Sequence, residues 1–309
     1  MRLLFLWLAA FGIAQAQEMG ALFRPGPSGR TFTFKESFYG RSKVHGQAGK
    51  LEQRDWDVRG SGSIWQKDGW EMTLGLEARD LVLHHPSPLL HPYRMVQGTL
   101  GARRYGKANQ VRGFNISYGS ASDRPFRRVS NDTASANYVH QFNEKWWMLV
   151  NWSNNRTFLN NVPLPGVFYV AKMSRQETLL YGLPVFMWRK RWASGIEGQY
   201  FGFIPFNHRA HVGWFWNDFH GVVLSYEYRP QVYFRDARQE RDERFFFIEN
   251  RLLLEIQGSI IPRLLQWQIG AGHAFNRSAF EARNFSSKKR FDLPLGDTWL
   301  AQGQVSSQF

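Results

Sequence analysis

Histidine, serine and glutamate are the residues of this chain whose types and spacing could support chemistry. His84, His85 and His91 fall in a proline-rich stretch, where three imidazoles could hold a transition metal. Neighbouring residues of an extended chain point to opposite sides, so His84 and His85 would chelate poorly. The chain also has no cysteine, which excludes a thiolate metal site, a disulfide framework and a cysteine nucleophile. We therefore predict no metal and no other cofactor.

A lipid hydrolase would need a serine and a histidine on one outer face, with a third group to orient them. Ser117 and His140 are available, but the residues around them do not resemble those of such enzymes. Glu71 and Glu77 would share a strand face, where solvated carboxylates are the commoner interpretation. The sequence thus predicts no catalytic residue, and a lipid-modifying enzyme stays as the third alternative for function.

The elements that position these residues are strands, because period-2 alternation recurs along the chain and helical periodicity is scarce. From Trp70 to Ala78 the even positions are apolar, and the odd positions from Glu71 to Arg79 include three charged residues. Similar splits recur in five later segments. One face of each strand is therefore apolar and the other polar.

The first sixteen residues have the features of a cleaved signal peptide. Arg2 supplies a positive start, residues 3–13 form an apolar run, and Ala14-Gln15-Ala16 is a small-x-small cleavage site. We predict export of the chain and a single mature domain over residues 17–309. Export argues against nucleic-acid partners, although 39 Lys plus Arg against 25 Asp plus Glu give a net charge of +14.

Together these features predict an all-β fold: a transmembrane antiparallel up-and-down β-barrel in the outer membrane, with its apolar face toward lipid. A closed barrel leaves no backbone group unpaired in hydrocarbon. A secreted soluble β-sandwich is the alternative, but Trp is rarely buried completely and this chain has 13. We predict the following aromatic residues at the membrane interfaces: Trp70, Trp146, Trp152, Trp192, Trp214, Trp216, Tyr226 and Tyr228.

The C-terminus resembles the last strand of bacterial outer-membrane barrels, which typically ends in an aromatic residue. Trp299, Val305 and Phe309 stand at alternate positions of this strand. The resemblance implies that the barrel-insertion machinery reads these residues as its signal.

The spacing of turn residues predicts strands over sixteen ranges: 31–44, 52–66, 69–83, 93–105, 110–120, 134–142, 145–156, 164–172, 176–182, 184–189, 191–202, 207–216, 219–234, 244–257, 263–275 and 297–309. Sixteen strands would leave each about eighteen residues, barely enough for a span and its share of loops. We therefore favour about fourteen strands, with twelve and sixteen as alternatives. Short turns are expected at Asn143-Glu144, at residues 189–191 and at Asn217-Asp218, and a long external loop over residues 276–296.

The polar face predicts a lumen of balanced charge. The lumen-lining residues are expected to be Glu71, Glu77, Arg79, Arg103, Glu197, Gln199, Arg209, His211, Glu227, Arg229, Glu249, Arg251, Glu255, Gln257, Gln266 and Gln268. The excess positive charge falls in connections, at Arg124, Arg127 and Arg128, at residues 189–191 and at residues 288–290. We expect these to contact the phosphates of lipopolysaccharide and of outer-membrane lipids.

Three segments, residues 162–169, 181–184 and 270–277, resemble an uncharacterised family of Gram-negative outer-membrane β-barrels. The resemblance implies the fold and the outer-membrane location, and no catalytic residue. The preferred function is a passive pore for small hydrophilic solutes. The alternative is a closed structural or surface-interaction barrel whose basic loops contact lipopolysaccharide.

Overall fold

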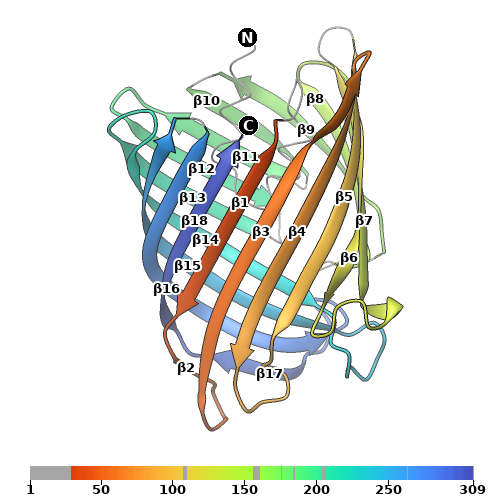
Figure 1. Ribbon diagram of the computed structural model, residues 1–309, viewed down its shortest axis with the longest axis vertical. Coiled ribbons are helices and arrows are strands. Elements are labelled where there is room, and N and C mark those ends of the chain that lie inside the picture. The colour runs from red at the N-terminus through yellow and green to blue at the C-terminus, as the bar shows by residue number, and fades with distance from the viewer. Residues whose placement is uncertain are drawn as a thin grey trace.

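The computed structural model describes residues 29–106, 110–155, 161–174, 176–183, 185–203, 207–262 and 264–308. Sixteen antiparallel strands form a closed ring (Figure 1). In order around the ring they are β1 (Thr31–Tyr39), β3 (Lys50–Lys67), β4 (Trp70–His84), β5 (Tyr93–Tyr105), β6 (Val111–Ser122), β7 (Asp132–Gln141), β8 (Trp146–Ser153), β9 (Leu164–Met173), β10 (Glu177–Leu183), β11 (Val185–Arg191), β12 (Ile196–Phe203), β13 (Asn207–Phe215), β14 (Gly221–Tyr233), β15 (Arg244–Ile261), β16 (Leu265–Ala282) and β18 (Thr298–Gln308).

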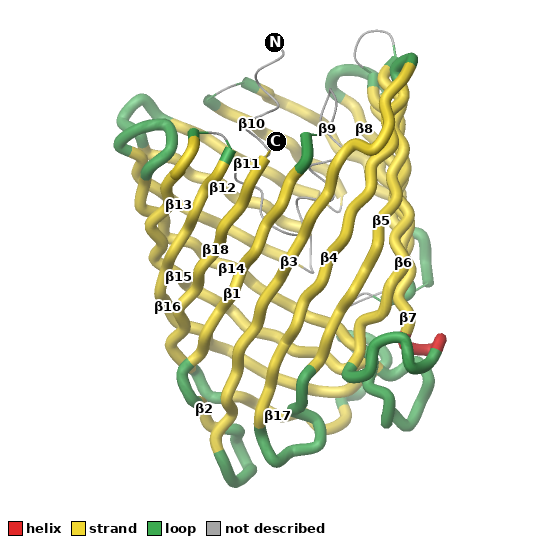
Figure 2. Tube along the Cα trace, in the orientation of Figure 1, coloured by secondary structure: helices red, strands yellow, loops and turns green. Residues whose placement is uncertain are grey.

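The ring closes where the first strand meets the last. β1 pairs with β18 from Thr31, opposite Gln308, to Tyr39, opposite Leu300. We call the end of the barrel at which β1 begins and β18 finishes the terminal end, and the opposite end the loop end. The long connections gather at the loop end, at the bottom of Figure 2.

Two short strands lie outside the ring, both at the loop end. β2 (Ser42–Lys43) pairs with the start of β3, and β17 (Arg290–Leu295) pairs with the end of β16. The expectation of one long loop over 276–296 is therefore wrong, because β16 continues to Ala282 and β17 follows within the same range. A three-residue 3-10 turn, Val129–Asn131, also lies at this end.

The preferred count of about fourteen strands is wrong, and the alternative of sixteen is the one observed. The uniform allocation of residues failed because β10 and β11 have only 7 residues each and β12 has 8. The expected turn at residues 189–191 is also wrong, since these residues end β11. The turn follows at residues 192–195, where Gly195 has φ +81°.

The outer face of the ring is apolar and exposed. Trp70, Ile196, Val212 and Leu252 are 41%, 42%, 59% and 43% exposed. In a β-sandwich these side chains would pack between two sheets, whereas here a single sheet closes on itself. The soluble-sandwich alternative is therefore excluded.

Charged residues border this outer apolar face at both ends of the strands. Toward the loop end, Arg94 donates to Asp80 at 2.9 Å through both Nε and Nη2, and Arg54 pairs with Glu36. Toward the terminal end, the Arg104 guanidinium lies 5.5 Å from the centre of the Trp70 ring. Among the residues that the structure describes, no helix has the length and apolar character needed to cross a membrane.

Candidate functional site: the barrel interior and its loop-end mouth

The inner face of the wall changes character from the loop end to the terminal end. Along β3 the inward residues are first apolar, then charged or amidic, then small and neutral: Leu51, then Gln53, Asp55, Asp57 and Arg59, then Ser61 and Ser63. β4 repeats the order with Leu83 and Leu81, then Arg79 and Glu77, then Gly75 and Thr73, but it starts at the terminal end with the fully buried Glu71, which pairs with Arg103 of β5. We call these the apolar mouth, the ionic zone and the neutral zone.

At the apolar mouth, side chains from distant strands touch. The Tyr93 ring on β5 stacks on the Phe245 ring on β15, with 4.1 Å between centroids and 5° between planes. Around the ring, β4, β3, β1, β18 and β16 separate these two strands. Leu81, Leu83 and Phe247 are fully buried in the same cluster. The mouth is therefore closed by contacts between facing walls.

Backbone hydrogen bonds reinforce this closure. Phe234 N–H, just after β14, donates to the Ala121 carbonyl of β6 at 2.7 Å, and Asp123 N–H donates back to the Phe234 carbonyl at 3.3 Å. Ser122 and Phe234 form an isolated parallel bridge. β6 and β14 are eight steps apart in a ring of sixteen, so they belong to opposite walls. We call the contact between residues 121–131 and 234–238 the clasp.

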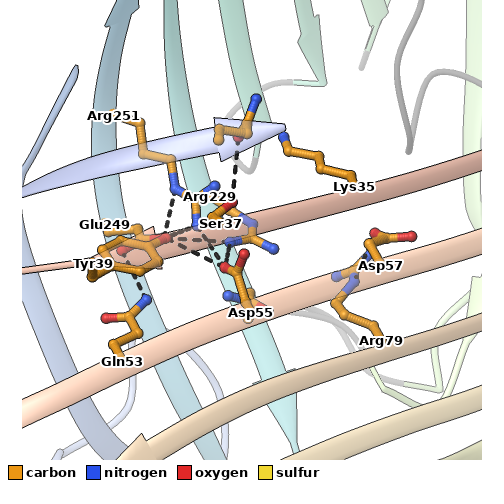
Figure 3. A network of polar contacts seen from close by, with 12 residues as sticks. Lys35, Ser37, Tyr39, Gln53, Asp55, Asp57, Arg79, Arg229, Glu249 and Arg251 are labelled. Atoms are coloured by element: carbon orange, nitrogen blue, oxygen red, sulfur yellow. Dashed lines mark hydrogen bonds and ion pairs between the residues drawn. The ribbon is translucent and has the colours of Figure 1, made fainter. Parts of the chain in front are cut away.

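In the ionic zone, Asp55 joins the β3 wall to β14 and β15 (Figure 3). Its carboxylate accepts from Arg251 Nη2 at 2.7 Å and also pairs with Arg229. Arg251 Nε donates to Glu249 at 2.7 Å, and the Tyr39 hydroxyl donates to Glu249 at 2.8 Å. Glu249 and Arg251 are both fully buried. A chord of ion pairs thus crosses the interior.

Further ion pairs lie along the wall itself. Arg59 Nη2 lies 2.6 Å from an Asp57 carboxylate oxygen and 2.7 Å from a Glu77 carboxylate oxygen. Arg79 pairs with the same two carboxylates, so the four residues form one group of ion pairs. On β11 and β12, Arg189 donates to Glu197 through Nε at 3.0 Å and Nη2 at 2.8 Å. Such bidentate pairs hold buried charge with satisfied hydrogen bonds. The ionic zone is therefore largely self-neutralising.

The neutral zone lies toward the terminal end on β1, β3, β15 and β16, whereas the inward residues of β6 to β11 form a buried apolar cluster that includes Val111, Val139, Trp147 and Phe168. The hydroxyls of Thr31 and Ser61 lie 2.8 Å apart, as do those of Thr99 and Ser117. Ser61 is exposed, and Gln257 is only half-buried. Water can therefore reach this part of the inner face.

All sixteen residues predicted to line a lumen lie on the inner face, because the strand register pairs them with one another around the wall. Glu249, Arg251 and Glu255 are buried in the ionic zone, whereas Gln257, Gln266 and Gln268 are half-buried in the neutral zone. Their role as the lining of a channel stays a prediction.

Sequence reasoning missed several inward charges: Lys35, Asp55, Asp57, Arg59, Arg189 and Arg277. Asp55, Asp57 and Arg59 alternate with Trp56 and Val58, and that signal could have revealed them. Arg277 could not be found by alternation, because a bulge around Asn276 (φ 49°) reverses which residues face inward. Arg277 Nη1 donates at 3.0 Å to the hydroxyl of Ser42, which lies in β2.

The aromatic residues predicted at the interfaces divide into two groups. Trp70, Trp146, Trp192, Trp214 and Trp216 are 40–55% exposed on the outer face at strand ends that point to the terminal end. Trp152, Tyr226 and Tyr228 are half-buried within or near the loop-end parts of their strands, and Tyr226 donates to Asn250 at 2.7 Å. Contact with lipid headgroups stays a prediction for both groups.

The candidate catalytic pair is not brought together. Ser117 is 2% exposed on the inner face, whereas His140 lies on the outer face, 4.6 Å from the Phe142 ring centre. Within the described ranges, no three His, Asp or Glu side chains are grouped as metal ligands would be. At the C-terminus, Trp299 and Val305 are exposed outward by 73% and 40%, and Phe309 lies outside the described residues.

No family model matches this chain, and no curated protein matches it in sequence. Solved outer-membrane barrels are similar to it in structure. An outer-membrane channel from Pseudomonas putida F1 gives a TM-score of 0.39 at 9% identity, over 92% of this chain and 97% of that one. A mutant of the monoaromatic hydrocarbon channel TodX gives 0.43 at 10% identity, over 92% and 91%. OmpF of Salmonella typhi gives 0.31 at 10% identity, over 91% and 97%.

At these identities the likeness concerns the general fold alone. The resemblance of residues 162–169, 181–184 and 270–277 to an uncharacterised family stays a prediction, and Pro184 among them lies outside the described residues.

Proposed function

We propose that this chain is an outer-membrane channel for small hydrophilic solutes, closed at its loop end in the conformation described. The observation that carries the proposal is the inner face of a sixteen-strand ring, which on β1, β3, β15 and β16 is polar and water-accessible toward the terminal end, and which is sealed at the loop end. Rings of sixteen strands are wide enough to enclose an aqueous passage. The seal is made of side chains and two loops, so the passage opens when they part.

The outer face supports a membrane location. On β4, the apolar outward residues run from Trp70 to Ala78, and Asp80 follows. Nine residues of a strand tilted by about 40° cover roughly 20–25 Å, close to the apolar band of outer-membrane barrels. In such barrels the long loops face the outside, so the clasp would lie at the cell surface. Export by the signal peptide and insertion through the Trp299, Val305 and Phe309 signal belong to the same proposal.

A cysteine pair tests whether the mouth is the gate. The chain has no native cysteine, so Ser122→Cys with Phe234→Cys places one disulfide across the clasp bridge. In planar bilayers we expect conductance steps with dithiothreitol and none after oxidation. The control is the single variant Ser122→Cys, whose conductance should not respond to either reagent.

The second candidate is a closed structural barrel, and the chord through Asp55 favours it, because Glu249 and Arg251 are fully buried where they meet the β3 wall. This candidate would be established if the reduced double variant conducts nothing but keeps its heat-modifiable migration on gels. If the oxidised and the reduced double variant conduct equally, the gate lies elsewhere and the mouth is rejected as the gate.

A further inference from the structure

One carboxylate in the clasp receives three guanidinium groups. Asp236 pairs with Arg127 Nη1 at 2.9 Å, with Arg128 Nε at 3.0 Å and with Arg124 Nη1 at 3.9 Å. The three arginines come from the loop after β6, and Asp236 comes from the loop after β14. In Figure 1 these loops lie together at the lower right. Two loops of opposite walls are thus joined by charge.

The single negative charge of Asp236 does not neutralise the three guanidinium groups around it. Asp236 is 8% exposed, but the side chains of Arg124, Arg127 and Arg128 are 60%, 50% and 59% exposed. Arg238 adds a fourth guanidinium and Asp123 a second carboxylate, which leaves two positive charges in excess (4 − 2). Within the described part of the chain, Asp236 is the carboxylate nearest to all three arginines.

The same carboxylate belongs to the closure. Asp236 N–H donates to Asp123 Oδ1 at 2.7 Å, two residues beyond the Phe234 bridge. Arg238 donates to the Ser130 carbonyl at 2.8 Å and to Asn131 Oδ1 at 2.5 Å. A change at Asp236 therefore acts directly on the contact between the walls.

We propose that Arg124, Arg127 and Arg128 form a binding site for a phosphate group, which displaces Asp236 and releases the clasp. A phosphate carries more charge than a carboxylate and offers three acceptor oxygens to the guanidinium forks. The exposed side of the three arginines allows it to approach without prior opening. The release step rests on the proposed channel function, whereas the binding step does not.

Binding is measured by calorimetry on the folded barrel in detergent, with inorganic pyrophosphate as the probe. We expect Asp236→Asn to bind pyrophosphate more tightly than the unmodified protein, because the competing carboxylate is lost. Arg127→Ala with Arg128→Ala should weaken binding about tenfold or more, since each loses a charge-assisted hydrogen bond. The matched control is Arg283→Ala, which removes an exposed arginine paired with Glu240 at the same end and should leave binding unchanged.

Conductance then tests the release. Pyrophosphate in the bath on the loop side should raise the open fraction of the unmodified protein, and Asp236→Asn should be open without it. A bilayer whose loop-side leaflet contains lipopolysaccharide forms the second arm. A response in that arm alone assigns the site to lipid-borne phosphate, and a response to pyrophosphate assigns it to phosphate in solution.

The two proposals fail in different ways. Equal pyrophosphate binding by all variants would overturn the phosphate site. Tight binding with an unchanged open fraction, in a protein that conducts, would overturn the release step. If no variant conducts although binding follows the expected order, the channel function fails and the phosphate site stands.

Discussion

The Tyr93 ring on β5 lies parallel to the Phe245 ring on β15, with 4.1 Å between their centroids. Because five strands separate β5 from β15 around the ring, this distance measures how closely two walls approach. Tyr233 packs against the same tyrosine at 5.3 Å. Any widening of the loop-end mouth must therefore begin by separating Tyr93 from the rings of β14 and β15.

Replacing Tyr93 by alanine should destabilise the folded barrel by about 3–5 kcal/mol, as expected for a large buried aromatic residue. The change removes the ring stack and the hydrogen bond from the Tyr93 hydroxyl to the Leu89 carbonyl at 3.0 Å. Urea unfolding in lipid vesicles measures the loss. Phe126→Ala, at a residue 55% exposed at the same end, should cost less than about 1 kcal/mol. Equal losses of unfolding free energy in the two variants would mean that packing at the mouth does not stabilise the barrel more than an exposed loop residue does.

Removing the Asp55 carboxylate should be costly for a different reason. Asp55→Ala leaves the guanidiniums of Arg229 and Arg251 without this buried partner, and breaking such a pair typically costs about 3–5 kcal/mol. Asp218→Ala is the control, since the Asp218 side chain is 67% exposed and its pair with Arg191 should contribute about 1 kcal/mol or less. The free energies come from the same unfolding experiment. An Asp55 variant as stable as the Asp218 variant would show that the chord is hydrated.

The orientation of the wall can be tested with a charge on its outer face. Leu76 is 65% exposed near the middle of β4, so Leu76→Arg should lower the stability in vesicles by about 2–4 kcal/mol. Val129→Arg places the same charge at an 84% exposed loop residue and should change stability little. A Leu76 variant that folds as stably as the Val129 variant would contradict a lipid-facing outer surface.

The clasp should respond to acid in a defined direction. The hydrogen bond from Arg127 and the charges of Arg128 and Arg127 hold the pKa of Asp236 below its usual value. A carboxyl group with a lowered folded pKa contributes stability above its unfolded pKa of about 3.9 and loses it as pH falls through the folded value. The clasp should therefore persist from pH 7 to about 4 and weaken below that.

Hydrogen exchange of the Asp123 and Phe234 amides, corrected for intrinsic rates, measures this persistence, because both amides donate across the clasp. Asp236→Asn removes the titrating group and should abolish the acid transition. Loss of protection already between pH 7 and 5 would contradict the assignment of the acid transition to Asp236.

The sequence predicted the wall well because alternation is a local property. The range 93–105 matches β5 at both ends, and each of the sixteen predicted ranges overlaps one strand of the ring. The short strands β10 and β11 were also expected, over 176–182 and 184–189, whereas local patterns could not reveal the bulge that turns Arg277 inward.

The closure of the mouth was beyond sequence reasoning for a further reason. Tyr93 and Phe245, or Ser122 and Phe234, meet only because the ring brings opposite walls together. Arg124, Arg127 and Arg128 converge on Asp236, which the sequence did not indicate, and their contact with lipid phosphates stays a prediction. No feature of either loop alone indicates the other as its partner.

The bridge between Ser122 and Phe234 also bears on the order of assembly. Most neighbouring strands of the ring are joined by short connections, whereas this bridge links residues 112 positions apart (234 − 122). Contacts of such separation carry a larger loop-closure entropy and form late. We therefore expect the clasp to form after the hairpin pairings of the wall.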